Sequence, residues 1–179
     1  MHIRRVRNEE DSMRRFVEEL WLPYHRDLDA AVGSHAMAED VAVDDIVEFR
    51  TDYFDDPSRR LWVALDDVDD QAGSLSELDA TFAGFLSTSL KTPPAKFENP
   101  DQLHLGNFYV DPAYRGDGLA DDLIARAVQH AREDGAVELT LEVNVNNERA
   151  LAYYEKLGFD VSKYRMRVPL DEVQVDVQS

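Results

Sequence analysis

A short turn between a predicted strand and a predicted helix holds the residues best suited to bind phosphate. Arg115, Gly116 and Gly118 follow an apolar segment that ends at Val110, and they precede a helix that begins near Ala120. Glycine lets the backbone approach a ligand closely because it has no Cβ atom. Free N–H groups at a helix N-terminus, aided by the helix dipole, bind diphosphate groups. The turn is therefore a candidate phosphate-binding site.

Two common phosphate-binding motifs do not fit this turn. The dinucleotide-binding fingerprint needs a third glycine where Asp121 stands, and the P-loop needs a Gly-Lys-Ser/Thr sequence that the chain lacks. A plain strand-to-helix turn without a ligand is the alternative interpretation. The two glycines alone do not decide between them.

The wider spacing around the turn resembles a known family signature. The pattern is Val110-x-Pro112-x-x-Arg115-x-x-Gly118-x-Ala120. It is similar to the Arg/Gln-x-x-Gly-x-Gly/Ala signature of the GNAT superfamily, which consists of acetyl-CoA-dependent N-acetyltransferases. This resemblance favours a ligand-binding turn over a plain one.

A second element of the same family lies at the expected distance along the chain. It reads Asn147-x-x-Ala150-x-x-x-Tyr154-x-x-x-Gly158-Phe159. The region that resembles the family runs from about residue 82 to residue 170. Two linked motifs make a coincidental match improbable.

The resemblance implies that acetyl-CoA is the co-substrate and that backbone groups hold it. In the family, the strand before the turn splays from the next strand, and the pantetheine arm pairs with the exposed backbone. Phe108, Tyr109 and Val110 would then bind the cofactor. The N–H of Phe108 would hold the acetyl carbonyl, and the N–H of Val110 would hold the pantetheine. Asn147 of the second element is also assigned to the cofactor. The turn that would hold the diphosphate consists of Arg115, Gly116, Asp117, Gly118, Leu119 and Ala120.

Acyl transfer from a thioester to an amine needs a neutral amine, an oxyanion stabiliser and a proton for the departing thiolate. Tyr154 occupies the motif position at which many family members place a tyrosine beside the CoA sulfur, so the resemblance implies that it is the acid. Its neighbour Tyr153 lies about 100° around the helix and serves as a control. The alternative is that Tyr154 is a core aromatic residue.

His104 is the candidate base. It lies four residues before Phe108, where several family members carry a base on the same strand. Period-two alternation places His104, Gly106 and Phe108 on one face, unless a bulge at Gly106 changes the phase. A histidine pKa of about 6.5 leaves the ring largely neutral at pH 7, so it could accept a proton directly or through water. Glu142 is the alternative base, and a structural role is the alternative for His104.

Metal and thiol chemistry are not expected. The chain has no cysteine, which excludes disulfides, thiolate catalysis and zinc–sulfur sites. The remaining histidines follow no ligand spacing, so no metal site is predicted. They are His2, His25, His35 and His130.

The predicted elements alternate in a way that indicates an α/β fold. Apolar spacing predicts strands over 2–7, 61–65, 81–90, 103–110 and 137–145, helices over 13–24, 43–54, 120–131 and 150–157, and a last extended segment over 159–170. Loops are expected over 66–79 and 91–100. Asn8 is the expected cap of the first helix, Pro23 its expected end or bend, and Asn146 or Asn147 the cap of the last.

The resemblance implies a single-domain GNAT fold over residues 1–170. We expect a mixed central sheet of six to seven strands flanked by about four helices. Residues 171–179 would form a loosely attached acidic tail.

The charge balance bears on partners and surroundings. The chain of 179 residues has 37 Asp and Glu against 19 Lys and Arg, a formal net charge of −18. Nucleic acid and anionic membranes would be repelled. No segment approaches membrane-spanning length, and a cytoplasmic protein is expected. The composition resembles that of proteins from salt-loving microbes, and an ordinary acidic cytosolic protein is the alternative.

These observations predict an acyltransferase that moves acetyl from acetyl-CoA to a primary amine by direct attack. The acceptor would be an amine-bearing small molecule or a protein amino group, selected by the segments near 24–45 and 164–169. Alternatives are a non-catalytic domain that senses acyl-CoA, and transfer of another short acyl group. The sequence does not define the oligomeric state, and a homodimer is compatible with it.

The same acidity conflicts with the predicted cofactor. Asp117, Asp121 and Asp122 crowd the turn, where Arg115 is the one local cation. We therefore expect acetyl-CoA binding to tighten as salt screens these carboxylates.

Overall fold

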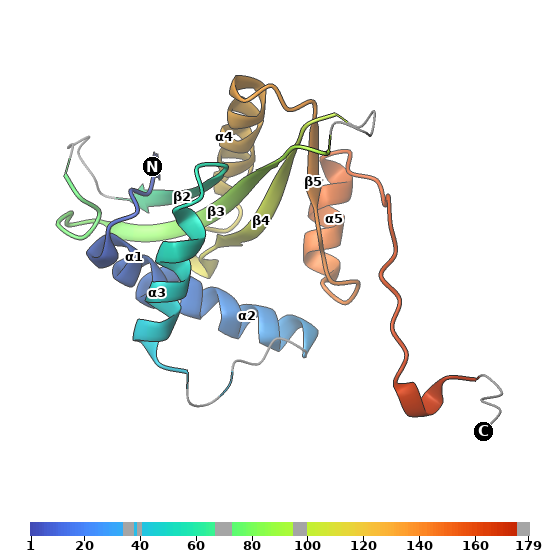
Figure 1. Ribbon diagram of the computed structural model, residues 1–179. Helices are drawn as coiled ribbons and strands as arrows, with labels where there is room; N and C mark the ends of the chain where they lie inside the picture. Colours follow the sequence, from blue (N-terminus) through green and yellow to red (C-terminus); the bar gives the residue numbers. More distant parts are fainter. Residues whose placement is uncertain (34–37, 39–40, 67–72, 95–99, 175–179) are drawn as a thin grey trace.

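The computed structural model describes residues 1–33, 38, 41–66, 73–94 and 100–174. Within them, five strands form one sheet in the order β1-β2-β3-β4-β5 (Figure 1). The strands are β1 (His2–Arg5), β2 (Arg59–Asp66), β3 (Thr81–Lys91), β4 (Gln102–Val110) and β5 (Glu138–Leu141). The first four are antiparallel neighbours, and β5 runs parallel to β4. Parts of the expected acceptor segment, of both loops and of the tail lie outside the described residues.

Helices cover both faces of this mixed sheet. On one face lie α1 (Glu10–Phe16), a π-helical turn (Val17–Trp21), α2 (Leu22–Val32) and α3 (Val43–Phe54) (Figure 1). The long helix α4 (Leu119–Glu133) covers the other face, and α5 (Glu148–Lys156) stands beside β5. Short 3-10 turns occupy Pro112–Tyr114 and Leu170–Glu172. The α/β architecture predicted from the sequence is confirmed.

The sheet separates two clusters of buried apolar side chains. Along β2, Leu61, Val63 and Leu65 pack toward α1 and α3, whereas Trp62 and Ala64 pack toward α4. Burial on both faces fits the continuous apolar run of this strand. The central strands are thereby held rigidly between two helical layers.

The predicted cap of the first helix was wrong, and of the two roles expected for Pro23, an end or a bend, the end is excluded. Asn8 does not cap it, because its side-chain amide donates to the carbonyl of Thr51 on α3 at 2.8 Å. Pro23 does not end it, because the π-helical turn places the proline in the first turn of α2, where a missing N–H costs little. The helix instead continues to Gly33, which adopts a left-handed φ of 60°.

The predicted strand over 137–145 is shorter than expected. β5 ends at Leu141, and the flanking Val137 and Val145 are 72% and 76% exposed. A strand extends only while a neighbour continues its hydrogen-bond ladder, and β4 supplies one for only four residues. Alternation of apolar residues therefore overestimated the strand.

The number of strands was also overestimated, since the described residues form five strands rather than six or seven. Residues 160–169, here called the C-terminal arm, are outside the sheet and run away from α5 (Figure 1). The arm has no backbone partner in the described part of the chain that would make it a strand.

Candidate functional site

The sheet opens between β4 and β5. The two strands pair from Gln102 opposite Glu138 to Leu105 opposite Leu141, and there β5 ends. β4 continues to Val110, so residues 106–110 have no strand partner on this side among the described residues. The backbone edge of β4 is therefore available at this opening.

A β-bulge in β4 lies at the start of the opening. Thr88 of β3 pairs with Leu105 and Leu86 pairs with Phe108, so one residue of β3 faces two of β4. The N–H of Asn107 donates to Oγ of Ser87 at 2.8 Å. A Cβ atom on Gly106 would lie only 2.5 Å from that oxygen, which explains a glycine here.

The bulge changes which side chains share a face. Leu105 and Phe108 both pack toward α4, whereas Tyr109 packs toward α1 and α3. His104 therefore lies on the face of Tyr109 and not of Phe108. Simple alternation of His104, Gly106 and Phe108 on one face was wrong, and the bulge that Gly106 permits is the reason.

Two amides of β4 point into the opening. The N–H of Asp111 donates to the carbonyl of Ala83 in β3 at 2.9 Å. Successive amides of a strand point to opposite edges, so the N–H groups of Val110 and Phe108 face the side on which β5 has ended. These are the two donors that the family resemblance assigned to the acetyl carbonyl and to the pantetheine.

The turn after β4 has the backbone expected of an anion site. Gly116 and Gly118 adopt left-handed φ values of 96° and 87°, and no atom lies within 4 Å of either Cβ position. α4 begins at Leu119, so the amides of its first turn have no partner within the helix. Both glycines are needed for this path, and the space beside them is open.

The side chain of Arg115 is directed away from the turn. Its Nη2 forms an ion pair with Oδ2 of Asp27 in α2 at 2.6 Å, and its Nε donates to the carbonyl of Val110 at 2.8 Å. These contacts tie α2 to the end of β4. The cation that the sequence placed at the diphosphate is thus paired with a carboxylate, while a groove beside the turn is lined by Asp66, Asp117 and Asp122.

Tyr154 and Tyr153 occupy different surroundings on α5. Burial, and then the nearby Tyr24, raise the pKa of Tyr154 to about 12, so its hydroxyl stays protonated. The hydroxyl of Tyr153 donates to Oδ1 of Asp121 at 2.9 Å and links α5 to α4. The cap of α5 is Asn147, whose Oδ1 accepts from the N–H of Ala150 at 3.2 Å, as predicted.

Tyr24 begins the segment 24–45 that was expected to select the acceptor, but it was not singled out as a site residue. Its ring lies 5.9 Å from that of Tyr109 and 5.6 Å from that of Phe85, and it contributes to the raised pKa of Tyr154. Burial raises the pKa of Tyr24 and, together with Asp27, raises that of Tyr109 to about 12. In the sequence Tyr24 belonged to an apolar helical stripe, which suggested a core residue.

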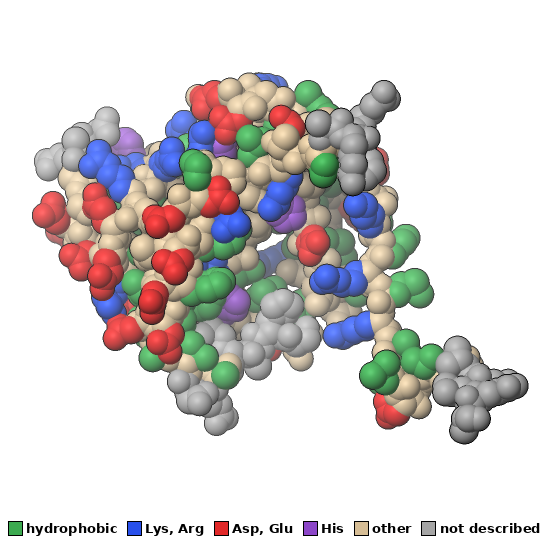
Figure 2. All heavy atoms as spheres, viewed as in Figure 1, with side chains coloured by type: hydrophobic (Ala, Val, Ile, Leu, Met, Phe, Trp, Pro, Cys, Tyr) green, Lys and Arg blue, Asp and Glu red, His purple; other side chains and the backbone are tan. Residues whose placement is uncertain are grey.

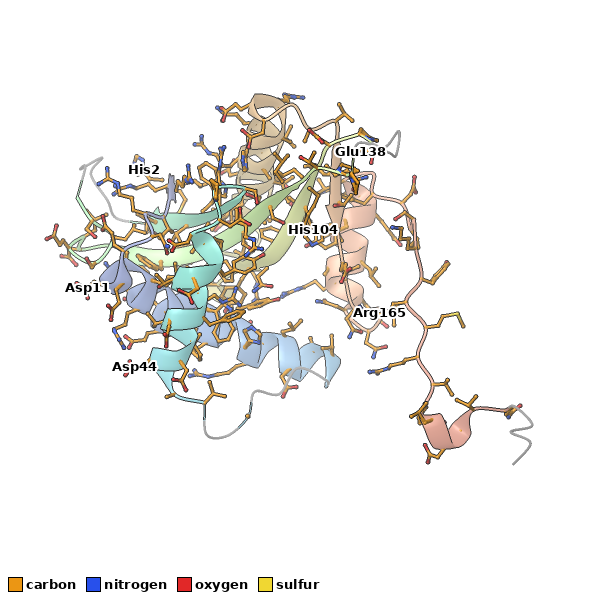
Figure 3. All side chains as sticks on the ribbon, viewed as in Figure 1. His2, Asp11, Asp44, His104, Glu138 and Arg165 are labelled. Atoms are coloured by element: carbon orange, nitrogen blue, oxygen red, sulfur yellow. The ribbon has the colours of Figure 1, made fainter. Side chains whose placement is uncertain are left out.

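His104 lies at the paired end of β4, beside β5 (Figure 3). Its Nδ1 is 3.2 Å from Oγ1 of Thr140. Burial and the positive charge of Lys91 lower its pKa, and Glu142 acts in the opposite direction. The half-buried ring is therefore neutral at pH 7. Glu142 itself is exposed just beyond β5.

Two further features are absent from the described residues. No group of three or more His, Asp or Glu side chains there could hold a metal ion. No helix in the described ranges is long and apolar enough to span a membrane.

Comparison with known sequences identifies a family. The model of the acetyltransferase (GNAT) family matches residues 14–159. N-alpha-acetyltransferase MAK3 of Arabidopsis thaliana is 50% identical over 56 residues, which are 31% of this chain and 30% of that protein. Glucosamine 6-phosphate N-acetyltransferase of Trypanosoma brucei brucei is 37% identical over 67 residues, 37% of this chain and 44% of that protein. The chain thus spans less than half the length of these curated relatives.

Solved structures share the fold. The tetramutant of the BH1408 protein from Bacillus halodurans superposes with a TM-score of 0.74 at 17% identity, covering 95% of this chain and 100% of that one. Glucosamine-6-phosphate N-acetyltransferase from Arabidopsis thaliana gives a TM-score of 0.60 at 17% identity, covering 95% and 98%. At these identities the likeness establishes the fold alone.

Proposed function

Because this chain belongs to the acetyltransferase (GNAT) family, we propose that it transfers an acetyl group from acetyl-CoA to a primary amine. The family match includes the opening between β4 and β5, the glycine turn and α5. The observation that carries the proposal is the opening itself, because two backbone donors of β4 face it without a strand partner among the described residues. Acetyl-CoA supplies the acetyl group as a reactive thioester.

The backbone donors at the opening match the hydrogen-bond acceptors of such a ligand. The N–H of Phe108 would bind the acyl carbonyl, and the N–H of Val110 would bind the pantetheine, which would lie along β4 like an added strand. The amides of the glycine turn and the first turn of α4 would hold the diphosphate. Oδ1 of Asn147 caps α5, which leaves its Nδ2 as a further donor for the cofactor.

Direct transfer assigns one task to each of three groups. His104, neutral at pH 7, accepts the proton that the amine loses as its nitrogen bonds to the acetyl carbon, directly or through water. The N–H of Phe108 stabilises the oxyanion of the tetrahedral intermediate, an effect of about 3 kcal/mol in comparable sites. Tyr154 donates its hydroxyl proton to the sulfur as the carbon–sulfur bond breaks.

The acceptor and the cellular setting also belong to the proposal. Relatives are named as an N-alpha-acetyltransferase, a glucosamine 6-phosphate N-acetyltransferase and a ribosomal protein bS18-alanine N-acetyltransferase, so both a protein amino group and a small amine are candidates. The net charge of −18 favours a cytoplasm rich in salt, where the surface repulsion is screened.

The test is an acetyl-CoA-dependent thiol-release assay over a panel of amines in molar KCl. Protein N-terminal peptides, lysine peptides, amino sugars, polyamines and amino acids cover the acceptor classes. Thiol release with one class, together with mass gain of that amine by one acetyl group, is the expected result. Tight acetyl-CoA binding without release for any amine would instead indicate a sensor domain, and turnover only with succinyl-CoA or propionyl-CoA would change the acyl group.

A further inference from the structure

Arg50 of α3 is a largely buried cation without an acidic partner among the described residues. Several other arginines pair with carboxylates, for example Arg14 with Asp44 and Arg60 with Asp134. Within the part of the chain that the structure describes, Arg50 forms no ion pair, and its buried Nε has no hydrogen-bond acceptor. In a chain with 37 acidic residues, this absence is unexpected. A charge removed from water without a counter-ion is costly, and such sites are often functional.

The guanidinium of Arg50 is oriented by aromatic rings. Its Cζ lies 4.8 Å from the ring centroid of Trp21 and 5.9 Å from that of Phe49. Burial lowers its pKa to about 10, which still leaves it charged at pH 7. A guanidinium stacked in this way keeps the donors on its edge free for a planar or tetrahedral anion.

Arg50 is connected to the opening through one residue. Tyr24 lies close enough for the charge of Arg50 to act on its hydroxyl, and the ring of Tyr24 contacts that of Tyr109. Tyr24 also contributes to the raised pKa of Tyr154, so the two side chains lie near each other. A bound molecule that contacts Arg50 and Tyr24 would therefore reach toward the proposed acyl group.

We propose that Arg50 binds an anionic group, a carboxylate or a phosphate, on the amine acceptor. The anion would replace the missing counter-ion and form charge-assisted hydrogen bonds with the guanidinium. The inference rests on the proposed acetyl transfer and narrows its substrate to amines that carry a negative charge.

Matched acceptor pairs test this proposal. One pair is an amino acid and its amide, and the other is an aminoalkyl phosphate and its amino alcohol, so the two arms separate carboxylate from phosphate. The wild type should have a kcat/KM about tenfold or more higher for the charged member of one pair, mostly through KM. Arg50→Gln should abolish that preference, and Arg50→Lys should retain part of it. Arg126→Gln is the control, because Arg126 stacks over Trp62 at 5.5 Å on α4.

Equal kcat/KM for charged and neutral members in the wild type would overturn the proposal, as would a preference that persists in Arg50→Gln. In that case Arg50 only packs over Trp21, and Arg50→Gln would lower the melting temperature without changing the preference between acceptors. If no amine is acetylated, the proposed function fails separately. Calorimetric titration of the same compounds then decides, since only the charged ones should bind and only when Arg50 is present.

The C-terminal arm carries a row of exposed apolar side chains. Its apolar side chains Tyr164, Met166 and Val168 are 83%, 91% and 56% exposed, and they alternate with Arg165 and Arg167. This is the period-two pattern of a strand with one apolar face. Figure 2 shows basic and apolar side chains along the arm, whereas acidic side chains gather over α1 and α3.

The edge of the sheet complements this arm. β5 is the last strand of the described sheet, so its outer edge has no partner there. Exposed acids, Glu138 and Glu142, lie on β5 and just after it, next to the exposed Val137. Within one chain Arg165 and Glu138 lie well apart (Figure 3). Unpaired edges of this kind readily accept another strand.

The geometry points to exchange of the arm between two copies of this chain. Each arm would add to the β5 edge of the other copy, with Arg165 and Arg167 near its acids. Such a contact is reciprocal and closes as a two-fold dimer. The arm leaves its own α5 away from the body, which suits the edge of a second molecule (Figure 1).

Light scattering and cross-linking test the exchange. The wild type should have the mass of two chains, and Met166→Pro should have the mass of one, because proline cannot donate to the ladder. Val173→Pro, beyond the arm, is the control and should stay dimeric. Since the chain has no cysteine, Val137→Cys and Met166→Cys chains can be mixed with a bis-maleimide, and a covalent dimer of the two is expected.

Two results would overturn the exchange. One is a wild type with the mass of a single chain. The other is a chain with both cysteines that cross-links internally and never to a second copy, which would mean that the arm folds onto its own β5.

Discussion

Tyr154 and Tyr153 are neighbours on α5, and they offer a matched comparison. Tyr154→Phe removes a hydroxyl that burial keeps protonated and that we assign to the departing sulfur. We expect kcat to fall about 100-fold with little change in the Kd of acetyl-CoA, since general acid catalysis contributes roughly that much. Steady-state kinetics and calorimetry of both variants check this.

Tyr153→Phe supplies the control for that comparison. Its hydroxyl bonds to Asp121 of α4 and its ring lies 6.1 Å from that of Phe108. We therefore expect a small loss of stability and a much smaller fall in kcat than in Tyr154→Phe. A kcat that falls equally in both variants, or in neither, would return Tyr154 to a structural role.

His104 predicts the pH dependence of the reaction. Burial and Lys91 lower its pKa below the usual value of about 6.5, so kcat/KM should hold at pH 7 and fall only as the pH drops below that value. His104→Gln should reduce kcat at least about tenfold and remove this acidic limb. If the fall of kcat/KM at low pH persists in His104→Gln but disappears in Glu142→Gln, Glu142 is the base.

At the scale of elements, the bulge in β4 places the two donors of the opening. Gly106→Ala brings a Cβ within 2.5 Å of the Oγ of Ser87, which is held by the N–H of Asn107. We expect a loss of about 1–3 kcal/mol in the free energy of unfolding and weaker acetyl-CoA binding. Urea unfolding of Gly106→Ala, Ser87→Ala and the double variant checks this mechanism. Because Ser87→Ala removes the clashing oxygen, the double variant should lose less free energy of unfolding than the two single variants lose together.

The packing of α4 on the sheet predicts a pH-dependent stability. His130 is 1% exposed, and its ring nitrogens contact Thr88 of β3 and Asp134, which in turn pairs with Arg60 of β2. Burial, and then Arg60, lower its pKa, while Asp134 and Glu133 act in the opposite direction.

The sign of the effect follows from proton binding. Below the unfolded pKa of about 6.5, the unfolded chain binds a proton that the folded His130 resists, so stability falls as the pH drops through 6.5. Melting temperatures between pH 7.5 and 5 should show this slope, and His130→Gln should reduce it. His2→Gln, at an exposed position, is the control and should leave the slope intact.

Local patterns predicted most elements because their apolar spacing is strong, as in β2 and α4. They also placed Tyr154 and Asn147 on one short helix. They could not predict the end of β5, because a strand depends on a partner far away in the sequence. They did not predict the contact of Tyr24 with Tyr109 or the pairing of Asp27 with Arg115 for the same reason, since these contacts join α2 to β4 and to the turn after it across 80 or more residues.

At the scale of the whole molecule, the acidic charge opposes the proposed cofactor. Acetyl-CoA carries several phosphate charges, and it would approach a chain with a net charge of −18. The groove beside the glycine turn is lined by Asp66, Asp117 and Asp122, and Arg115 is neutralised by Asp27. Repulsion should therefore exceed attraction at low salt.

This balance predicts an unusual salt dependence. Most polyanions bind proteins more weakly as salt rises, because salt screens attraction. Here the screened interaction is repulsion, so the Kd of acetyl-CoA should decrease from 0.05 M to about 1 M KCl, where the Debye length is roughly 3 Å. Isothermal titration over this range measures it. The double variant Asp117→Asn and Asp122→Asn should bind more tightly at low salt and respond less to KCl, whereas Asp44→Asn on the distant α3 should behave as the wild type. Binding that weakens steadily up to molar KCl would show that the glycine turn presents net positive potential, and the low-salt penalty assigned to its aspartates would then be wrong.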